Sequence, residues 1–138
     1  MNVKAPVSSI MTKDLITVGP KDSLSKVQEI FEGHNIHHLP VVEFKKIVGI
    51  VSKTDFMAFL RGAGQNEMDR LINETRLRSY KAEDIMTHGL AKLEPDDRIN
   101  VALDIFKMNR FHALPVAQDN ELVGIITTHD IIRALAEE

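Results

Sequence analysis

Two short stretches, SKTD at residues 52–55 and TTHD at residues 127–130, place a hydroxyl residue three positions before an aspartate. This spacing is close to that of a capping box, in which two side chains accept hydrogen bonds from backbone N–H groups at a helix start. The same geometry suits a nucleotide, because a fixed carboxylate can bind both hydroxyls of a ribose and free N–H groups at a helix start can bind a phosphate. The residues alone leave both interpretations open, a helix cap and a ribose-binding site.

The two stretches belong to a tandem duplication. When residues 10–60 are placed over residues 85–135 without a gap, 17 of the 51 aligned positions are identical. The identical positions include IMT, a Pro, an Ile-Phe pair, H-x-LPV, VGI and the aspartate of each stretch. Because a repeat decides the architecture, we expect a first repeat at residues 1–60 with a lead-in at 1–9, a connector at 61–81, and a second repeat at 82–138.

The sequence of each repeat predicts the same order of elements: a strand, a helix, two strands and a second helix. Short extended runs at 15–18 and 90–93 precede a helix with apolar residues at helical spacing, for which Asp22 and Ser23 are candidate N-caps. Two β-rich runs separated by a few polar residues then predict a hairpin, at 38–42 and 47–51 in the first repeat and at 113–117 and 122–126 in the second. The fold class is therefore α+β, built from two β-α-β-β-α repeats.

The closing helices of the repeats, predicted at 54–60 and 129–135, carry apolar residues on more than one side. A surface helix needs only one apolar stripe, so the surplus favours burial from two directions and a homodimer; a deeply buried helix in a monomer is the alternative. Between the repeats, Gly62 and Gly64 interrupt the chain, and residues 68–75 predict a short amphipathic helix.

Composition excludes several classes of function. The 138 residues include no cysteine, which excludes thiol nucleophiles and zinc–thiolate sites, and the net charge of −3 argues against nucleic acid as a partner. No apolar run approaches the roughly 18–20 residues of a membrane span, and no signal-like stretch opens the chain. We therefore expect a cytoplasmic protein that does not interact with membranes.

The ordered set of marks, found twice at a constant shift, resembles the CBS domain, named after cystathionine β-synthase. The marks are IMT, a Pro-led turn into the first helix, H-x-LPV, and GI-hydrophobic-[ST]-x-x-D. The resemblance implies that the repeats pack as a pseudo-twofold pair, with clefts that bind AMP, ADP, ATP or S-adenosylmethionine, and that pairs form dimeric disks. It also implies a regulatory module that acts on another protein, here without an effector domain of its own.

The resemblance also implies roles for individual residues. Asp55 and Asp130 would bind the ribose; Ile36 and Phe111 would line an adenine slot, although Phe111 could equally be a core aromatic. The phosphate-binding positions would be Ser52, Thr54, Thr127, His129, His37, His38 and His112.

The histidines of HNIHH at residues 34–38 have a spacing that could suggest a metal site on a helix. The segment leads into a predicted strand, and only His37 recurs in the second repeat, as His112, so no metal is expected. His37 could also be a structural loop residue. A histidine without a second cation binds phosphate weakly near neutral pH because it is only partly charged, which argues against tight polyphosphate binding.

The sequence offers no catalytic constellation: it lacks a P-loop and a nucleophile elbow, and its two repeated aspartates lie in separate repeats. We therefore expect a stand-alone sensor that binds an adenosine-containing ligand and transmits occupancy to a regulated protein, rather than an enzyme. The alternative is a constitutive dimeric interaction module in which SxxD and TxxD serve only as helix caps.

Overall fold

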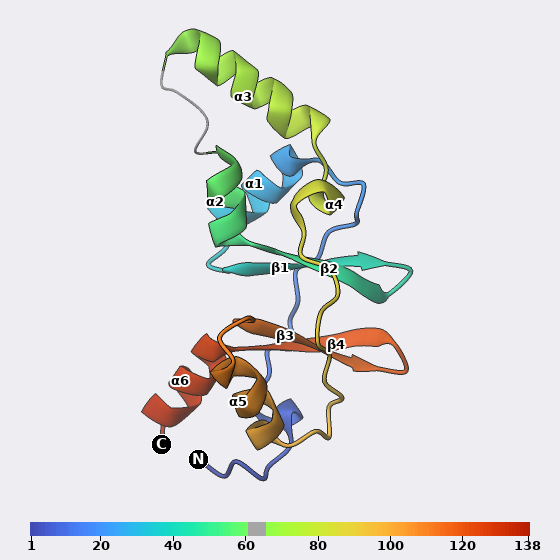
Figure 1. The fold of residues 1–138 in the computed structure, drawn as a ribbon, viewed down its shortest axis with the longest axis vertical. Coiled ribbons are helices and arrows are strands. Elements are labelled where there is room, and N and C mark those ends of the chain that lie inside the picture. Colours follow the sequence, from blue (N-terminus) through green and yellow to red (C-terminus); the bar gives the residue numbers. More distant parts are fainter. Residues whose placement is uncertain (61–65) are drawn as a thin grey trace. The chain divides into compact units, whose positions relative to one another are not determined.

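A computed structural model describes residues 1–60 and 66–138; Gly62 and Gly64 lie outside the described residues. The described chain combines helices with two β-hairpins, as the α+β prediction requires (Figure 1). In chain order they are η1 (Val7–Ser9), α1 (Leu24–Gly33), β1 (His38–Glu43), β2 (Lys46–Ser52), α2 (Lys53–Leu60), α3 (Glu67–Ser79), α4 (Ala82–Ile85), α5 (Ile99–Lys107), β3 (Ala113–Gln118), β4 (Glu121–Thr127) and α6 (Thr128–Ala136).

The first helix of each repeat forms where the apolar spacing predicts it. Ser23 caps α1, since its side chain accepts a hydrogen bond from the Lys26 N–H, and Leu24, Val27 and Phe31 form the buried face. Asp22 is not the cap: its carboxylate accepts a hydrogen bond from the Gly19 N–H at 2.7 Å and closes the preceding turn.

The predicted opening strands at 15–18 and 90–93 are each reduced to a single parallel bridge, Val18 with Val41 and Leu93 with Val116. Val18 donates to the Pro40 carbonyl and accepts from the Val42 N–H. Extending this ladder toward the N-terminus would require an N–H at Pro40, which proline lacks. Pro115 imposes the same limit in the second repeat, so the prediction of a full strand was wrong in both.

Both predicted hairpins form, with turns shorter than the four polar residues suggested. Phe44-Lys45 and Asp119-Asn120 occupy the turns, and all four residues have positive φ. Two successive left-handed residues are typical of the type I′ turn, whose twist matches that of a hairpin. Residues of β3 and β4 pair antiparallel from Ala113 with Thr127 to Gln118 with Glu121.

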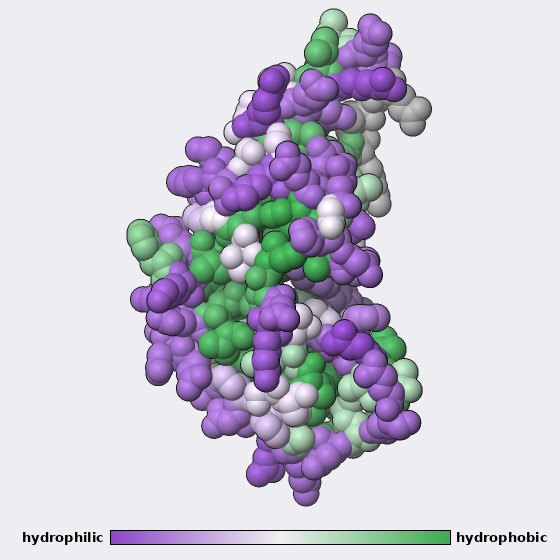
Figure 2. Space-filling view, turned by 180° about the vertical axis from the view of Figure 1, so that it is seen from behind, coloured by the Kyte–Doolittle hydropathy of each residue, from purple (hydrophilic) through white to green (hydrophobic). Residues whose placement is uncertain are grey.

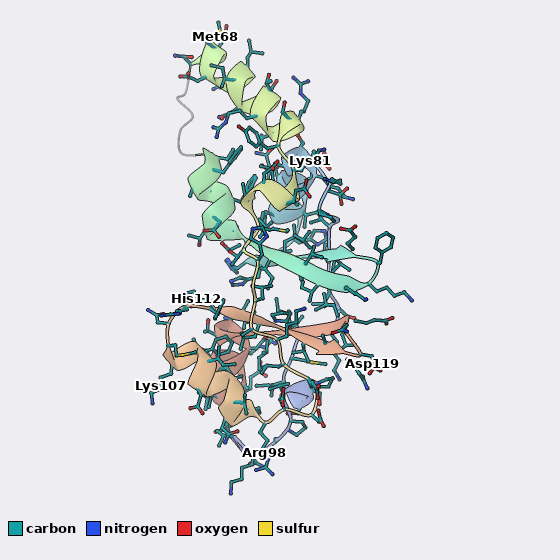
Figure 3. The ribbon with its side chains drawn as sticks, turned by 45° about the vertical axis from the view of Figure 1, so that its right-hand side comes forward. Met68, Lys81, Arg98, Lys107, His112 and Asp119 are labelled. Atoms are coloured by element: carbon teal, nitrogen blue, oxygen red, sulfur yellow. The ribbon has the colours of Figure 1, made fainter. Side chains whose placement is uncertain are left out.

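The connector helix α3 is longer than predicted. The Asn66 side chain caps it by accepting from the Asp69 N–H at 2.8 Å, and near its end Leu77 is buried. The Arg76 guanidinium lies 4.2 Å from the centre of the Phe59 ring, which anchors the helix to the end of α2. The start of α3, at Met68, is exposed (Figure 3).

The chain forms two compact units that interleave the repeats. The first-repeat unit comprises residues 16–44 and 48–89, and the second-repeat unit comprises residues 1–15, 45–47 and 90–138. Each has its own core, in which an amphipathic helix covers a hairpin: Leu24, Leu39 and Val51 are fully buried in the first unit, and Ile99, Leu114 and Ile126 are buried in the second.

The IMT lead-in of each repeat packs on the strand that carries VGI in the other repeat. Thr12 exchanges two backbone hydrogen bonds with Ile125 in the second-repeat unit, and Thr87 does the same with Ile50 in the first-repeat unit. A Cβ atom at Gly49 would lie 2.5 Å from the Met86 sulfur. The glycine of each VGI thus makes room for the methionine of an IMT, which explains why these two marks recur together.

Candidate functional site

The first-repeat unit holds one candidate site, at the start of α2. The Lys53 N–H donates to the His37 carbonyl at 2.8 Å, which ties the segment before β1 to the helix start. The Asp55 N–H donates to the Ser52 hydroxyl oxygen at 3.0 Å, so the serine caps the helix. The Asp55 carboxylate is exposed and accepts no hydrogen bond within the described residues. Only half of the capping box has formed, and the acid remains available.

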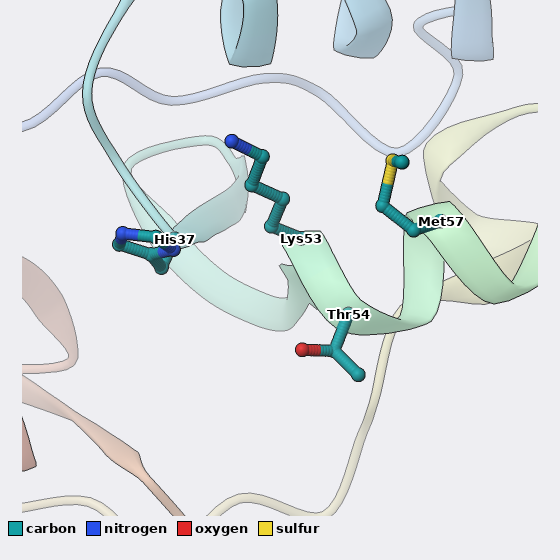
Figure 4. Close-up of a pocket in the computed structure, with 4 residues that line it drawn as sticks. All are labelled: His37, Lys53, Thr54 and Met57. Atoms are coloured by element: carbon teal, nitrogen blue, oxygen red, sulfur yellow. The ribbon is translucent and has the colours of Figure 1, made fainter.

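A shallow pocket of about 290 Å³ lies beside this helix start, lined by His37, Lys53, Thr54 and Met57 (Figure 4). The Lys53 side chain extends toward the side on which His37 lies, while Met57 lies one turn along the helix. Within the described chain Lys53 forms no ion pair. The pocket thus combines a free ammonium, a histidine and a hydroxyl, which are groups that bind phosphate.

The sequence offers Lys53 as a cation of the first repeat, without a specific role among the predicted site residues. The sequence signal was present, since Lys53 lies between the two marked positions Ser52 and Asp55. What the sequence could not show is that the backbone bond to His37 fixes the helix start beside the histidine.

The second-repeat unit holds the corresponding arrangement at the start of α6. The Thr128 N–H donates to the His112 carbonyl at 3.0 Å; His112 lies where the chain leaves α5 and enters β3 (Figure 3). The capping box is complete: the Asp130 N–H donates to the Thr127 hydroxyl at 3.1 Å, and the Thr127 N–H donates to Asp130 Oδ2 at 2.9 Å.

Two further donors engage the Asp130 carboxylate. The Thr12 hydroxyl donates to Oδ1 at 3.0 Å, and the Arg133 Nη2 atom lies 2.8 Å from the same oxygen. Asp130 is only 3% exposed and is the buried charged residue of the described chain. Desolvation of the carboxylate is compensated by these hydrogen bonds and by the guanidinium, as a buried charge requires.

The remaining predicted site residues lie near the two helix starts. His38 opens β1, and His129 is exposed in the first turn of α6. Ile36 and Phe111 are partly buried and pack against the cores of their own units, so their adenine-slot role stays a prediction. Within the described residues, no three His, Cys, Asp or Glu side chains cluster as metal ligands would, and no helix is long and apolar enough to cross a membrane.

Comparison with known proteins places these features in a family. The CBS domain family matches the chain twice, over residues 7–62 and 82–137. The chain belongs to the CBS domain family, as a tandem CBS pair, and both the resemblance and the α+β fold of two repeats are confirmed.

Among curated relatives, inosine-5′-monophosphate dehydrogenase of Methanocaldococcus jannaschii is 32% identical over 90% of this chain, which covers 22% of that enzyme. The uncharacterized protein MJ0188 of the same organism is 34% identical over 100% of this chain and 46% of that protein. The chain thus spans less than half the length of either relative. The match to the dehydrogenase covers about a fifth of the enzyme.

Two similar solved structures contain ligands. CBSX2, a CBS-pair protein of Arabidopsis thaliana, was solved in complex with AMP and is 27% identical, with a TM-score of 0.77 over 96% of this chain and 97% of that one. The CBS domain pair of MJ0100, solved with 5′-methylthioadenosine and S-adenosyl-L-methionine, is 28% identical, with a TM-score of 0.72 over 96% of each chain. Adenosine-containing ligands thus occur in CBS pairs of this size.

Proposed function

We propose that this CBS pair is a regulatory module that binds an adenosine-containing ligand and transmits its occupancy to another protein. The observation that carries the proposal is the Asp55 carboxylate at the start of α2, which has no partner within the described chain and lies in the same helix start as the pocket of His37, Lys53 and Thr54. The ligands of CBSX2 and of the MJ0100 pair support the adenosine class.

In this proposal the ribose hydroxyls donate to Asp55, and a phosphate is bound by Lys53, His37 and the hydroxyls of Ser52 and Thr54. The carboxylate accepts both ribose hydrogen bonds without losing an existing partner in the described chain. A charged acceptor strengthens these bonds. Asp130, Thr127, His129 and His112 form the corresponding set in the second-repeat unit, and His38 adds a second imidazole next to His37.

Ligand occupancy can be transmitted only if the ligand binds two states of the module with different affinities. We propose that these states differ in the pose of the repeats or of a homodimer, with the regulated protein reading the difference. The cytoplasmic location is part of the same proposal.

The apolar side chains left exposed support the homodimer. Met57 on α2 is 50% exposed, and Ile132 and Leu135 on α6 are 62% and 51% exposed. Figure 2 shows apolar residues at the surface among polar ones on the face drawn there. The prediction that these helices are buried from two directions is therefore not met within one chain, where Phe56 on α2 and Ile131 on α6 are the only buried apolar residues of the two helices. The molecular mass from light scattering tests the dimer in the wild type and in Ile132→Glu. The introduced negative charge should dissociate the dimer into monomers.

A thermal-shift panel tests ligand binding. The panel contains AMP, ADP, ATP, S-adenosylmethionine and NADH, with guanosine nucleotides as controls. A ligand at about 100 times its dissociation constant adds about 2.7 kcal/mol to the free energy of unfolding, hence several degrees in Tm. Asp55→Asn should abolish the shift, whereas Asp104→Asn, an exposed aspartate on α5, should retain it. If no ligand raises the Tm, the proposal is contradicted, and the constitutive interaction module remains as the alternative.

A further inference from the structure

Among the positions at which the two candidate sites differ, two exchange a lysine or an arginine for an uncharged residue. Lys53 in the first repeat corresponds to Thr128 in the second, and Ala58 corresponds to Arg133. One exchange removes a cation from the second site, and the other adds a cation that pairs with the repeated aspartate. Among the described residues, the two sites therefore present opposite arrangements: an ammonium and a carboxylate without ion-pair partners in the first, and a carboxylate paired with a guanidinium in the second.

Asp130 has little capacity left for a ribose. Its Oδ1 atom accepts from the Thr12 hydroxyl and from Arg133, and its Oδ2 atom accepts from the Thr127 N–H. A ribose diol would have to displace at least one of these donors. Hydrogen bonds to charged groups are the strong ones in proteins, and a donor displaced from Asp130 would exchange such a bond for one to water. Binding of ribose at this site starts with a penalty that the first site lacks.

At the first site, the Lys53 ammonium favours ligands that carry a negative charge. Its ammonium lines the pocket next to His37 and has no ion-pair partner within the described chain. A phosphate on the 5′ position gains a charge-assisted hydrogen bond from this group. An uncharged thioether nucleoside gains nothing, and a sulfonium is repelled because both groups are cations.

We infer that the chain takes one phosphorylated adenosine nucleotide, at the first-repeat site, with Lys53 as the residue that selects for phosphate, and that Arg133 and Thr12 keep the second-repeat site closed to ribose. This inference rests on the proposed function, and it adds the ligand class and the stoichiometry. It also makes the chain differ from a symmetric two-site sensor in spite of its repeated motifs.

Isothermal titration calorimetry tests the inference with AMP, adenosine and 5′-methylthioadenosine. Wild type should bind one AMP per chain, and adenosine more weakly. Lys53→Thr, which copies Thr128 into the first site, should weaken AMP binding about tenfold and leave the affinity for adenosine unchanged. An equal loss for both ligands would overturn the selective role of Lys53.

Arg133→Ala, which copies Ala58 into the second site, should raise the stoichiometry of AMP from one to two. Both substituted side chains are at least partly exposed, so the variants are expected to fold. Two AMP molecules on wild type, or a stoichiometry that stays at one in Arg133→Ala, would overturn the closed second site while leaving the proposed function intact. If none of the three ligands binds to wild type, the proposed function fails as well.

Discussion

The start of α2 and the start of α6 share a hydroxyl-x-x-acid spacing and the same backbone bond from the helix start to the preceding histidine, but their aspartates differ in state. Asp55 is exposed and its carboxylate accepts no hydrogen bond from the residues that the structure describes, whereas Asp130 is 3% exposed and has three donors. Duplication has therefore conserved the scaffold and altered the chemistry. Of the two interpretations that the residues alone leave open, the capping box describes Asp130, and ribose binding stays a prediction for Asp55, whose carboxylate has no hydrogen-bond partner among the described residues.

The largest expected effect concerns the glycines that admit the methionines of the lead-ins. A Cβ at Gly49 would lie 2.7 Å from Met86 Cγ and 3.0 Å from Met86 Cβ, whereas at Gly124 the nearest atoms are the sulfur and methyl end of Met11. The far end of a methionine can move, but the base of the side chain cannot. Gly49→Ala should cost about 2–3 kcal/mol in the free energy of unfolding, and Gly124→Ala about 1 kcal/mol.

Urea denaturation of the two glycine variants measures this difference. If Gly124→Ala lowers the free energy of unfolding as much as Gly49→Ala or more, Met11 does not yield to the added methyl group more easily than Met86 does, and the expected difference is contradicted.

The next largest effect is a difference between Asp55 and Asp130 in their contribution to the free energy of unfolding without ligand. Asp130→Asn removes the charge that pairs with Arg133 and an acceptor for the Thr127 N–H, so we expect a loss of about 1–2 kcal/mol. Asp55→Asn should change the free energy of unfolding by less than about 0.5 kcal/mol, as is usual for an exposed residue. Thermal unfolding of the ligand-free variants gives both values. Equal losses would mean that Asp55 also has a structural role.

The smallest expected effect is the pH dependence of stability that comes from the turn before the first helix of each repeat, where Asp22 and Asp97 occupy corresponding positions. Asp22 accepts from the Gly19 N–H and Asp97 accepts from the Glu94 N–H, both at 2.7 Å, but only Asp22 has a lysine, Lys26, nearby. The Gly19 hydrogen bond, helped by Lys26, lowers the pKa of Asp22 below its ordinary value of 3.8. The resulting stabilisation is present above pH 3.8 and is lost as the pH falls through the folded-state pKa.

Thermal unfolding between about pH 2 and pH 5 measures this contribution. Asp22→Asn should lose the pH-dependent part and show a flatter acid limb, and Lys26→Met should lose a smaller part because the Gly19 hydrogen bond remains. An acid limb that is unchanged in Asp22→Asn would contradict the assignment.

The sequence predicted the parts of this molecule that depend on local spacing. The helices, the hairpins and the cap at Ser23 followed from periodicity and capping rules, and the internal repeat with its motifs indicated the family. The opening strands were overpredicted because the effect of Pro40 and Pro115 on a parallel ladder requires the pairing to be known. The reason for each VGI glycine was also hidden, since Met86 and Met11 pack on it from the other repeat.

The membership of the candidate site stays a prediction, and the difference between the two aspartates depends on contacts that the sequence shows only in part. The spacing of Asp130 and Arg133 permits an ion pair on a helix, so that part could have been read from the sequence. The hydrogen bond from Thr12 could not, because that residue lies 118 positions away along the chain. Likewise, the pocket beside Lys53 depends on the backbone bond that joins Lys53 to His37.

The central claim is that an adenosine nucleotide binds at the start of α2, and amide chemical-shift mapping by NMR during an AMP titration tests it most directly. We predict shifts that saturate at residues 52–57 and at His37, with residues 127–133 unchanged. Shifts confined to residues 127–133, or no saturable shift at either helix start, would contradict the claim.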